Sequence, residues 1–169
     1  MNIFLKLKHW QLFVLLMGIP FFQIIVEPEN QTIVQLLAAL FLCVYFGWLY
    51  SLGVNLHKKL PSSVKMNLKK FKWRFFVSIA VMLLTGVLAG TDNEIAFVVM
   101  LIPSLVLAYC IFYCYYFIAK ALKAVESQEP NEDFLGEFFY LWFFPIGVWL
   151  IQPRVNKIFD ENLQNKITA

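Results

Sequence analysis

Charged side chains divide the sequence into long segments that carry no formal charge. With histidine counted as neutral, these segments are residues 9–26, 30–57, 75–91, 95–119 and 138–153. Apolar side chains fill them without the alternation of period two that marks a strand. A helix needs about 17–25 mostly apolar residues to cross the hydrocarbon of a bilayer, and the first four segments meet that length. The pattern therefore predicts several helices that cross a membrane.

We place four transmembrane helices near residues 10–26, 32–52, 75–90 and 95–119. Short polar turns join the first helix to the second and the third to the fourth, so the four helices are expected to form two helical hairpins. The predicted fold class is therefore all-α. The chain is expected to be a polytopic helical membrane protein, with residues 1–169 forming a single integral membrane domain.

The fifth segment differs from the others because aromatic residues crowd it and Pro145 and Gly147 interrupt its middle. Half of the side chains in residues 134–149 are aromatic. Aromatic rings, above all those of Trp and Tyr, favour the headgroup boundary over the centre of a bilayer. We expect an aromatic C-terminal helix over residues 134–152 that is interfacial or re-entrant, followed by a polar tail over residues 153–169. A complete fifth span is the alternative.

Composition supports the membrane interpretation. Hydrophobic residues make up 60% of the chain and charged residues 15%, and the mean hydropathy is +0.68. A soluble globule of this size could not bury so much apolar surface, and the remainder would promote aggregation. The same figures exclude a disordered chain, a collagen-like chain and a small disulfide-rich scaffold.

Lysine and arginine are confined to alternate connections between the predicted spans. The basic loop, residues 57–74, holds six lysines, one arginine and no acid, and the N-terminal arm adds Lys6 and Lys8. The connections expected on the other side, residues 27–31 and 92–94, hold acids but no lysine or arginine. The positive-inside rule therefore places the N-terminus and the basic loop in the cytoplasm of a multi-pass protein. In a bacterium, the membrane would be the plasma or inner membrane.

The middle of each predicted span lacks acidic and basic side chains. Proton relays and ion-coupled transporters need ionisable groups at that depth. Cys43, Cys110 and Cys114 do not form the Cys-x-x-Cys pair of redox enzymes, and both histidines lie near span ends. We therefore expect no catalytic residue, metal ligand or cofactor, and a non-enzymatic role is favoured.

A few polar and small residues inside the spans are candidates for helix packing or for the lining of a pore. Gln23 and Gln35 lie near the outer ends of adjacent helices and are expected to hydrogen-bond across the hairpin. Gly86 and Gly90 have the small-xxx-small spacing of close helix contacts. Tyr113 belongs to a tyrosine stripe on the fourth span, where a phenol needs a polar partner.

Basic residues at the cytoplasmic ends are candidates for contact with lipid headgroups or with a protein partner, because anionic headgroups attract lysine and arginine. These candidates are Lys58, Lys59, Lys69, Lys70, Arg154 and Lys157. Few aromatic side chains lie beside them for base stacking, so nucleic acid is not expected as a partner.

The sequence therefore predicts a protein that acts by assembly, as an oligomeric pore, a membrane effector or an accessory subunit. Its expected partners are membrane lipids, with a second copy or a cytoplasmic protein as further candidates. Two other classes stay open. A lipid-modifying enzyme at the cytoplasmic surface would need Glu137, His57, Arg154 and the acidic stretch 126–133 to converge. A passive channel or facilitator for a small solute is the other alternative.

Overall fold

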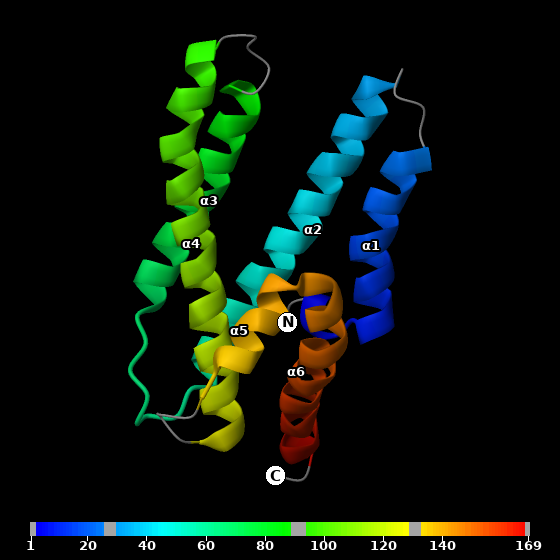
Figure 1. Cartoon of the computed structure of the whole chain (residues 1–169). Helices are drawn as coiled ribbons and strands as arrows, with labels where there is room; N and C mark the ends of the chain where they lie inside the picture. The colour runs from blue at the N-terminus through cyan, green and yellow to red at the C-terminus, as the bar shows by residue number, and fades with distance from the viewer. Residues whose placement is uncertain (1–2, 26–29, 89–93, 129–132, 168–169) are drawn as a thin grey trace.

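The structure, a computed structural model, describes residues 3–25, 30–88, 94–128 and 133–167, with side chains omitted at 87–88, 94–100 and 161–167. Within these ranges the chain forms one short 3-10 helix and six α-helices and contains no strand (Figure 1). The elements are η1 (Ile3–Leu5), α1 (His9–Ile25), α2 (Gln31–Lys58), α3 (Leu68–Leu88), α4 (Glu94–Ser127), α5 (Leu135–Trp142) and α6 (Phe144–Ile167). The prediction of an all-α fold is confirmed for the described residues.

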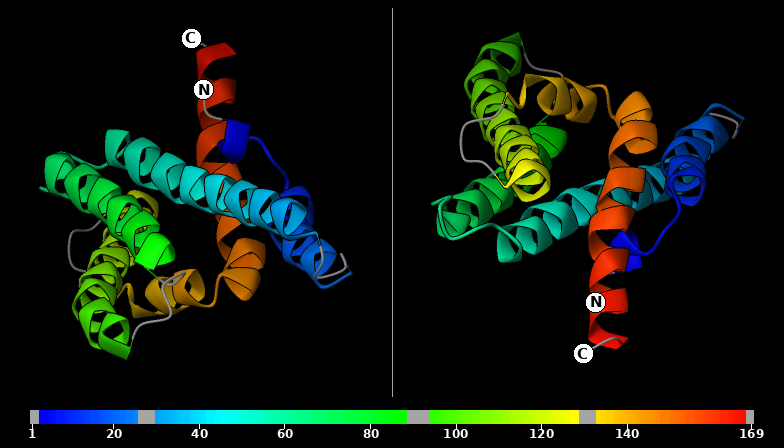
Figure 2. Two further views of the ribbon diagram at one scale, coloured as in Figure 1. Left: turned by 90° about the horizontal axis from the view of Figure 1, so that it is seen from above. Right: turned by 90° about the horizontal axis from the view of Figure 1, so that it is seen from below.

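The helices form two antiparallel pairs, α1 with α2 and α3 with α4 (Figures 1 and 2). At one end of the molecule α2 packs against α4, and the two pairs separate toward the other end. We call the first the basic end, because it carries the lysine-containing loop 59–67 together with the ends of α4 and α6. The opposite end, at the top of Figure 1, is called the far end.

Two helices are long and apolar enough to cross a membrane, judged by length and composition. They are α2 and the part of α4 from Leu101 to Ser127, and α1 is a shorter apolar helix. In each of the two longer helices, only 28% of the most apolar 18-residue window is buried inside the protein. The core helix of a soluble domain would be buried over most of such a window.

The hydrophobic core is concentrated where α2, α3 and α4 meet at the basic end. Phe71 of α3 and Phe117 of α4 are almost completely buried, and their ring centroids lie 4.6 Å apart. Gly53 of α2 makes this contact possible, because a Cβ atom there would lie 2.2 Å from Cζ of Phe71. Trp48 and Leu52 of α2 are fully buried in the same core.

The aromatic segment is divided into two helices that turn back on each other, where the sequence predicted one. The chain turns at Phe143, and both the start of α5 and the end of α6 point toward the basic end in Figure 1. Gly147 allows the close approach of the two helices, because a Cβ atom there would lie only 1.8 Å from the carbonyl oxygen of Tyr140. α6 continues through Pro153 to Ile167, so the helix extends beyond residue 152, where the aromatic helix was expected to end, into the polar tail.

Three helices extend beyond the predicted spans at the basic end. α2 continues to Lys58 and α4 to Ser127, whereas α3 begins at Leu68, seven residues before the expected start. A charged residue marks the end of an apolar segment but does not end the helix, because lysine is a good helix former in water. Asn67 helps α3 to begin early, since its Oδ1 accepts the backbone N–H of Lys70 at 3.0 Å.

Candidate functional site

An apolar groove separates the two helix pairs toward the far end. Its volume is about 820 Å³, and its walls are the first half of α2 and the second half of α3. Small side chains occur on both walls, and Gln35 is one of the few polar side chains in the groove. The lining residues are Gln35, Ala38, Ala39, Leu42, Cys43 and Phe46 of α2 and Ile79, Met82, Leu83 and Gly86 of α3.

Gly86 lines the groove. Among the described atoms, none would come within 4 Å of a Cβ atom at this position, apart from the chain neighbours and the backbone of its own helix. The role predicted for Gly86, in helix packing or in the lining of a pore, stays a prediction. Gly90, its proposed companion, lies outside the described residues.

The two glutamines of the first hairpin have different surroundings. Gln23 donates from Nε2 to the backbone carbonyl of Val34 at 3.1 Å and so ties α1 to α2. The expected bond from Gln23 to Gln35 is not formed. The side chain of Gln35 faces the groove and has no hydrogen bond to the described part of the chain. Within one chain, the two amides therefore do not line a common path.

Tyr113 of α4 contacts α3 through the guanidinium of Arg74. The guanidinium of Arg74 lies 3.7 Å from the centroid of the Tyr113 ring and donates to the hydroxyl of Tyr109 at 3.0 Å. A second tyrosine contact joins the two helix pairs, because the buried hydroxyls of Tyr45 and Tyr115 are hydrogen-bonded to each other. The tyrosine stripe that includes Tyr113 is visible in the sequence, whereas the pairing of Tyr45 with Tyr115 joins residues 70 positions apart and was not predicted.

Gln152 connects three parts of the basic end from a fully buried position. Its Oε1 accepts the indole N–H of Trp48 at 3.0 Å, and its Nε2 lies 2.8 Å and 3.0 Å from the carbonyl oxygens of Phe4 and Leu7. Asn156, one turn later on α6, donates to the same carbonyl of Leu7 at 3.1 Å. Buried amides need such partners, so Gln152 fixes α6 and the N-terminal arm on α2. A lone uncharged polar residue in an aromatic run was the signal that could have identified it.

Arg154 lies between two carboxylates instead of being open to phosphate. Its Nε donates to Glu126 Oε1 at 2.7 Å and its Nη2 to Glu137 Oε1 at 2.8 Å, with a further contact to Glu126 Oε2. The hydrogen bonds with Glu126, followed by those with Glu137, raise the pKa of Arg154 above its ordinary value. Arg154 thus joins α6 to α4 and α5, and its predicted contact with a lipid headgroup or a partner stays a prediction.

The groups named for an enzymatic alternative converge only in part. Glu126, Glu137 and Arg154 meet, but the carboxylates are engaged by the guanidinium. His57 is held elsewhere, since its Nε2 lies 2.9 Å from the carbonyl of Met66 and its ring stacks on Phe117. Within the described residues, no group of three or more His, Cys, Asp and Glu side chains could hold a metal ion.

The remaining basic candidates divide into engaged and exposed residues. Lys59 donates to the backbone carbonyl of Ile158, and its Nζ lies 4.3 Å from the centroid of the Phe159 ring, so it anchors α6. Lys157 is exposed on α6 and also has an interaction partner. Lys58, Lys69 and Lys70 are exposed at the end of α2 and the start of α3.

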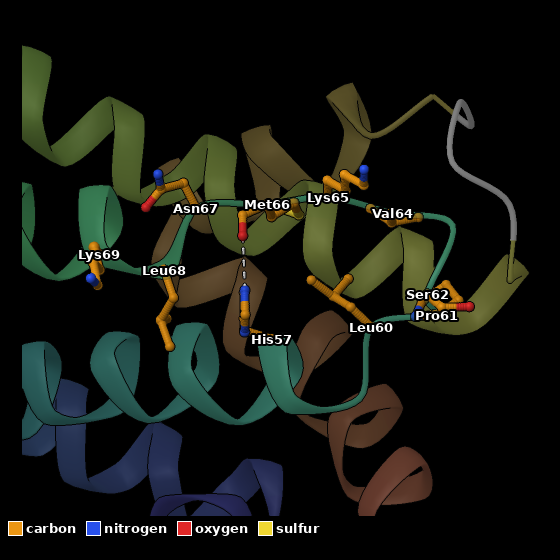
Figure 3. A pocket seen from close by; sticks show the side chains of 10 residues that line it. All are labelled: His57, Leu60, Pro61, Ser62, Val64, Lys65, Met66, Asn67, Leu68 and Lys69. Carbon is orange, nitrogen blue, oxygen red and sulfur yellow. Dashed lines mark hydrogen bonds between the residues drawn. The ribbon is translucent and has the colours of Figure 1, made fainter.

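A shallow cavity of about 660 Å³ lies beside these exposed lysines, between the end of α2 and the start of α3 (Figure 3). The bond from His57 to Met66 crosses it and holds the loop against α2. Lys65 and Lys69 line the cavity together with Ser62 and Asn67, and no acidic residue is among the lining residues.

Comparison of the chain with known protein families, with curated proteins and with solved structures found no match.

Proposed function

We propose that this chain is a multi-pass membrane protein that acts by assembly, with a second copy seated at the groove between α2 and α3. In this proposal α1–α4 cross the bilayer as two hairpins, and the basic end faces the cytoplasm. The single observation that carries the assembly proposal is the apolar groove with its unpartnered Gln35.

Exposed apolar side chains at the far end support the membrane placement. Ile24 is 82% exposed, Ile102 70% and Leu36 65%, and they belong to three different helices. Large exposed apolar side chains are unfavourable in water but are covered by acyl chains in a bilayer. α1, with 17 residues, reaches about 25 Å at 1.5 Å per residue, close to the thickness of the hydrocarbon.

The exposed tryptophans support the position of the cytoplasmic boundary. Trp10 lies at the start of α1, Trp73 near the start of α3, and Trp142 and Trp149 beside the turn between α5 and α6. These three places lie at a similar level in Figure 1. Tryptophan is enriched at the boundary between hydrocarbon and water, so α5 and the first turns of α6 fit an interfacial position. The lysine-containing loop then lies beyond the boundary.

A second copy fits the groove better than acyl chains do. Lipid tails cannot hydrogen-bond the amide of Gln35, whereas Gln35 of a second copy related by a two-fold axis can donate and accept at once. Ala38, Ala39 and Gly86 lack long side chains, so the backbone of a partner helix can approach closely. Helix association in a bilayer depends on such packing and hydrogen bonds, since apolar surface alone gives no preference over lipid.

Cys43 provides a direct test because it lies exposed in the groove, whereas Cys110 and Cys114 are buried. Copper-phenanthroline oxidation of membranes should yield a covalent dimer of the native protein. The variant Cys43→Ser should give none, and the matched variant Cys110→Ser/Cys114→Ser should crosslink as the native protein does. A dimer that persists in Cys43→Ser, or no dimer from the native protein, would contradict assembly at this groove.

The size of the detergent-extracted particle provides an independent readout. Gly86→Leu should convert a dimer into a monomer, because the new side chain fills the groove that the partner would occupy. Gly18→Leu is the matched control, since a Cβ atom at Gly18 also meets nothing within 4 Å but Gly18 does not line the groove. Mass photometry or light scattering should report a dimer for the native protein and for Gly18→Leu. A native particle with the mass of one chain would refute the proposal.

A further inference from the structure

We infer that the cavity beside loop 59–67 is a binding site for the phosphate headgroup of an anionic membrane lipid. The inference rests on the proposed membrane placement, which brings this loop to the cytoplasmic headgroups. It goes beyond that placement, because it assigns one site and one class of ligand. The ligand chemistry is a phosphate ester with a net negative charge, and we assign its source to the lipid of the surrounding leaflet.

The cavity and its surroundings carry positive charge that has no compensation within the described part of the chain. Lys65 and Lys69 line the cavity, and Lys58 and Lys70 are exposed at the adjacent positions in the sequence. In the described part of the chain, none of these four side chains has a hydrogen bond or an ion pair. The basic loop contains no acid at all. An external anion is therefore the group that would balance these charges.

The start of α3 also favours an anion at this place. Its first turn contains Lys69 and Lys70 and no acidic residue. The N-terminal end of a helix carries partial positive charge, so cations there are unfavourable and anions favourable. The backbone amides and the lysines thus repel each other unless an anion lies between them. A phosphate bound near the start of the helix would relieve this repulsion.

Neutral hydrogen-bond donors line the same cavity. Asn67 uses its Oδ1 to accept the backbone N–H of Lys70, which leaves its Nδ2 group to donate outward. The hydroxyl of Ser62 also lines the cavity. His57 holds the shape of the cavity, since a carbonyl can only accept and Nε2 must therefore donate to Met66. In Figure 3, His57 lies between α2 and the loop, and Asn67 and Ser62 lie toward opposite ends of the loop.

Two other basic residues at this end, Arg154 and Lys59, are engaged within the chain. Arg154 is paired with Glu126 and Glu137, and Lys59 is held by Ile158 and Phe159. These residues fix α6, whereas the lysines around the cavity are exposed. The charge on the basic end is thus divided between a structural group and a group open to an external ligand.

The test is native mass spectrometry of the detergent-solubilised protein, titrated with short-chain phosphatidylglycerol and, separately, with phosphatidylcholine of the same chain length. Each lysine near an anionic leaflet raises the binding affinity about fivefold. Lys65→Gln/Lys69→Gln should therefore bind phosphatidylglycerol about 25-fold more weakly than the native protein. The matched variant Lys6→Gln/Lys8→Gln removes the same charge from the exposed N-terminal arm and should change the affinity less than about twofold. Phosphatidylcholine should bind weakly to all three proteins.

Further variants keep the inference falsifiable. Lys65→Arg/Lys69→Arg should retain the affinity, so loss in both substitutions would show that charge is not the cause. Equal weakening by the two glutamine double variants would overturn the site, as would displacement of phosphatidylglycerol by millimolar inorganic phosphate at constant ionic strength. Failure of the proposed membrane placement is distinguishable, because the protein would then stay in solution without detergent. Failure of the assembly proposal would change the particle mass and leave lipid binding intact.

Discussion

The two halves of this molecule use similar apolar residues in opposite ways. Toward the basic end, Trp48, Leu52 and Phe117 are almost completely buried, and helices from all parts of the chain meet there. Toward the far end, Leu36 and Ile102 lie on helices of the same apolar character and are mostly exposed. Burial therefore depends on where a residue lies along its helix, and hydropathy alone does not determine it.

Polar contacts follow the same division. The basic-end half is tied by Gln152 and by the pairing of Arg154 with two glutamates, so that one helix, α6, holds the N-terminal arm, α2, α4 and α5 together. In the far half, Gln23 holds α1 to α2 across the hairpin. In the proposed arrangement, the basic-end half carries most of the stability of the chain, while the far half would present surface to the bilayer and to a second copy.

The largest predicted difference is between two leucines of α2. Leu52→Ala, at a fully buried position of the basic-end half, should lower the free energy of unfolding by about 3 kcal/mol, because it removes core contacts and leaves a cavity. Leu36→Ala, 65% exposed in the far half, should change it by less than about 0.5 kcal/mol. Denaturant titration in detergent micelles measures both. Equal effects would remove the distinction between the halves.

A somewhat smaller effect is expected at Gln152. Gln152→Leu leaves the indole N–H of Trp48 and the carbonyl of Phe4 buried without partners, at a cost of about 2–3 kcal/mol. The control is Gln31→Leu, which changes an exposed glutamine at the far end of α2 and should leave stability within about 0.5 kcal/mol. Hydrogen exchange should also show that the Gln152 variant loosens the N-terminal arm. If this arm stayed as protected as in the native protein, Gln152 would not be the residue that holds it.

The smallest effect concerns the turn between α5 and α6. Gly147→Ala should cost about 2 kcal/mol, because its Cβ atom overlaps the carbonyl of Tyr140 and a backbone must move. Gly136→Ala on α5 is the control, since its Cβ atom meets nothing within 4 Å and alanine favours the helix. Thermal unfolding should therefore show a lower melting temperature than the native protein for Gly147→Ala and a higher one for Gly136→Ala. A stabilised Gly147→Ala protein would contradict the close approach of the two helices.

Much of the helical layout could be predicted from the sequence. The starts of α1, α2 and α4 fall within one residue of their predicted positions. A charged residue or a short polar turn comes directly before each of these apolar segments, so the boundary is visible in the sequence. The early start of α3 was missed because a run of lysines was interpreted as loop, although Asn67 can cap a helix. The continuation of α6 past Pro153 was missed because the loss of apolar residues was taken as the end of the helix.

The candidate sites were predictable only where local sequence carries the information. The exposed lysines of the basic loop follow directly from their clustering, and the structure leaves Lys58, Lys69 and Lys70 open. The roles of Arg154 and Lys59 depend on partners 28 and 99 residues away, so no local pattern separates them from the open lysines. The groove arises from the divergence of two helix pairs, which is likewise a tertiary property.

The most direct test of the account is the labelling of single cysteines in intact cells with a membrane-impermeant maleimide. In a protein without its native cysteines, Asn30→Cys at the far end should be labelled from outside, because it lies exposed just before α2. Lys65→Cys in the basic loop should be labelled only after the membrane is permeabilised. Labelling of Lys65→Cys from outside, or equal labelling of both positions before permeabilisation, would contradict the proposed arrangement of two hairpins across the membrane.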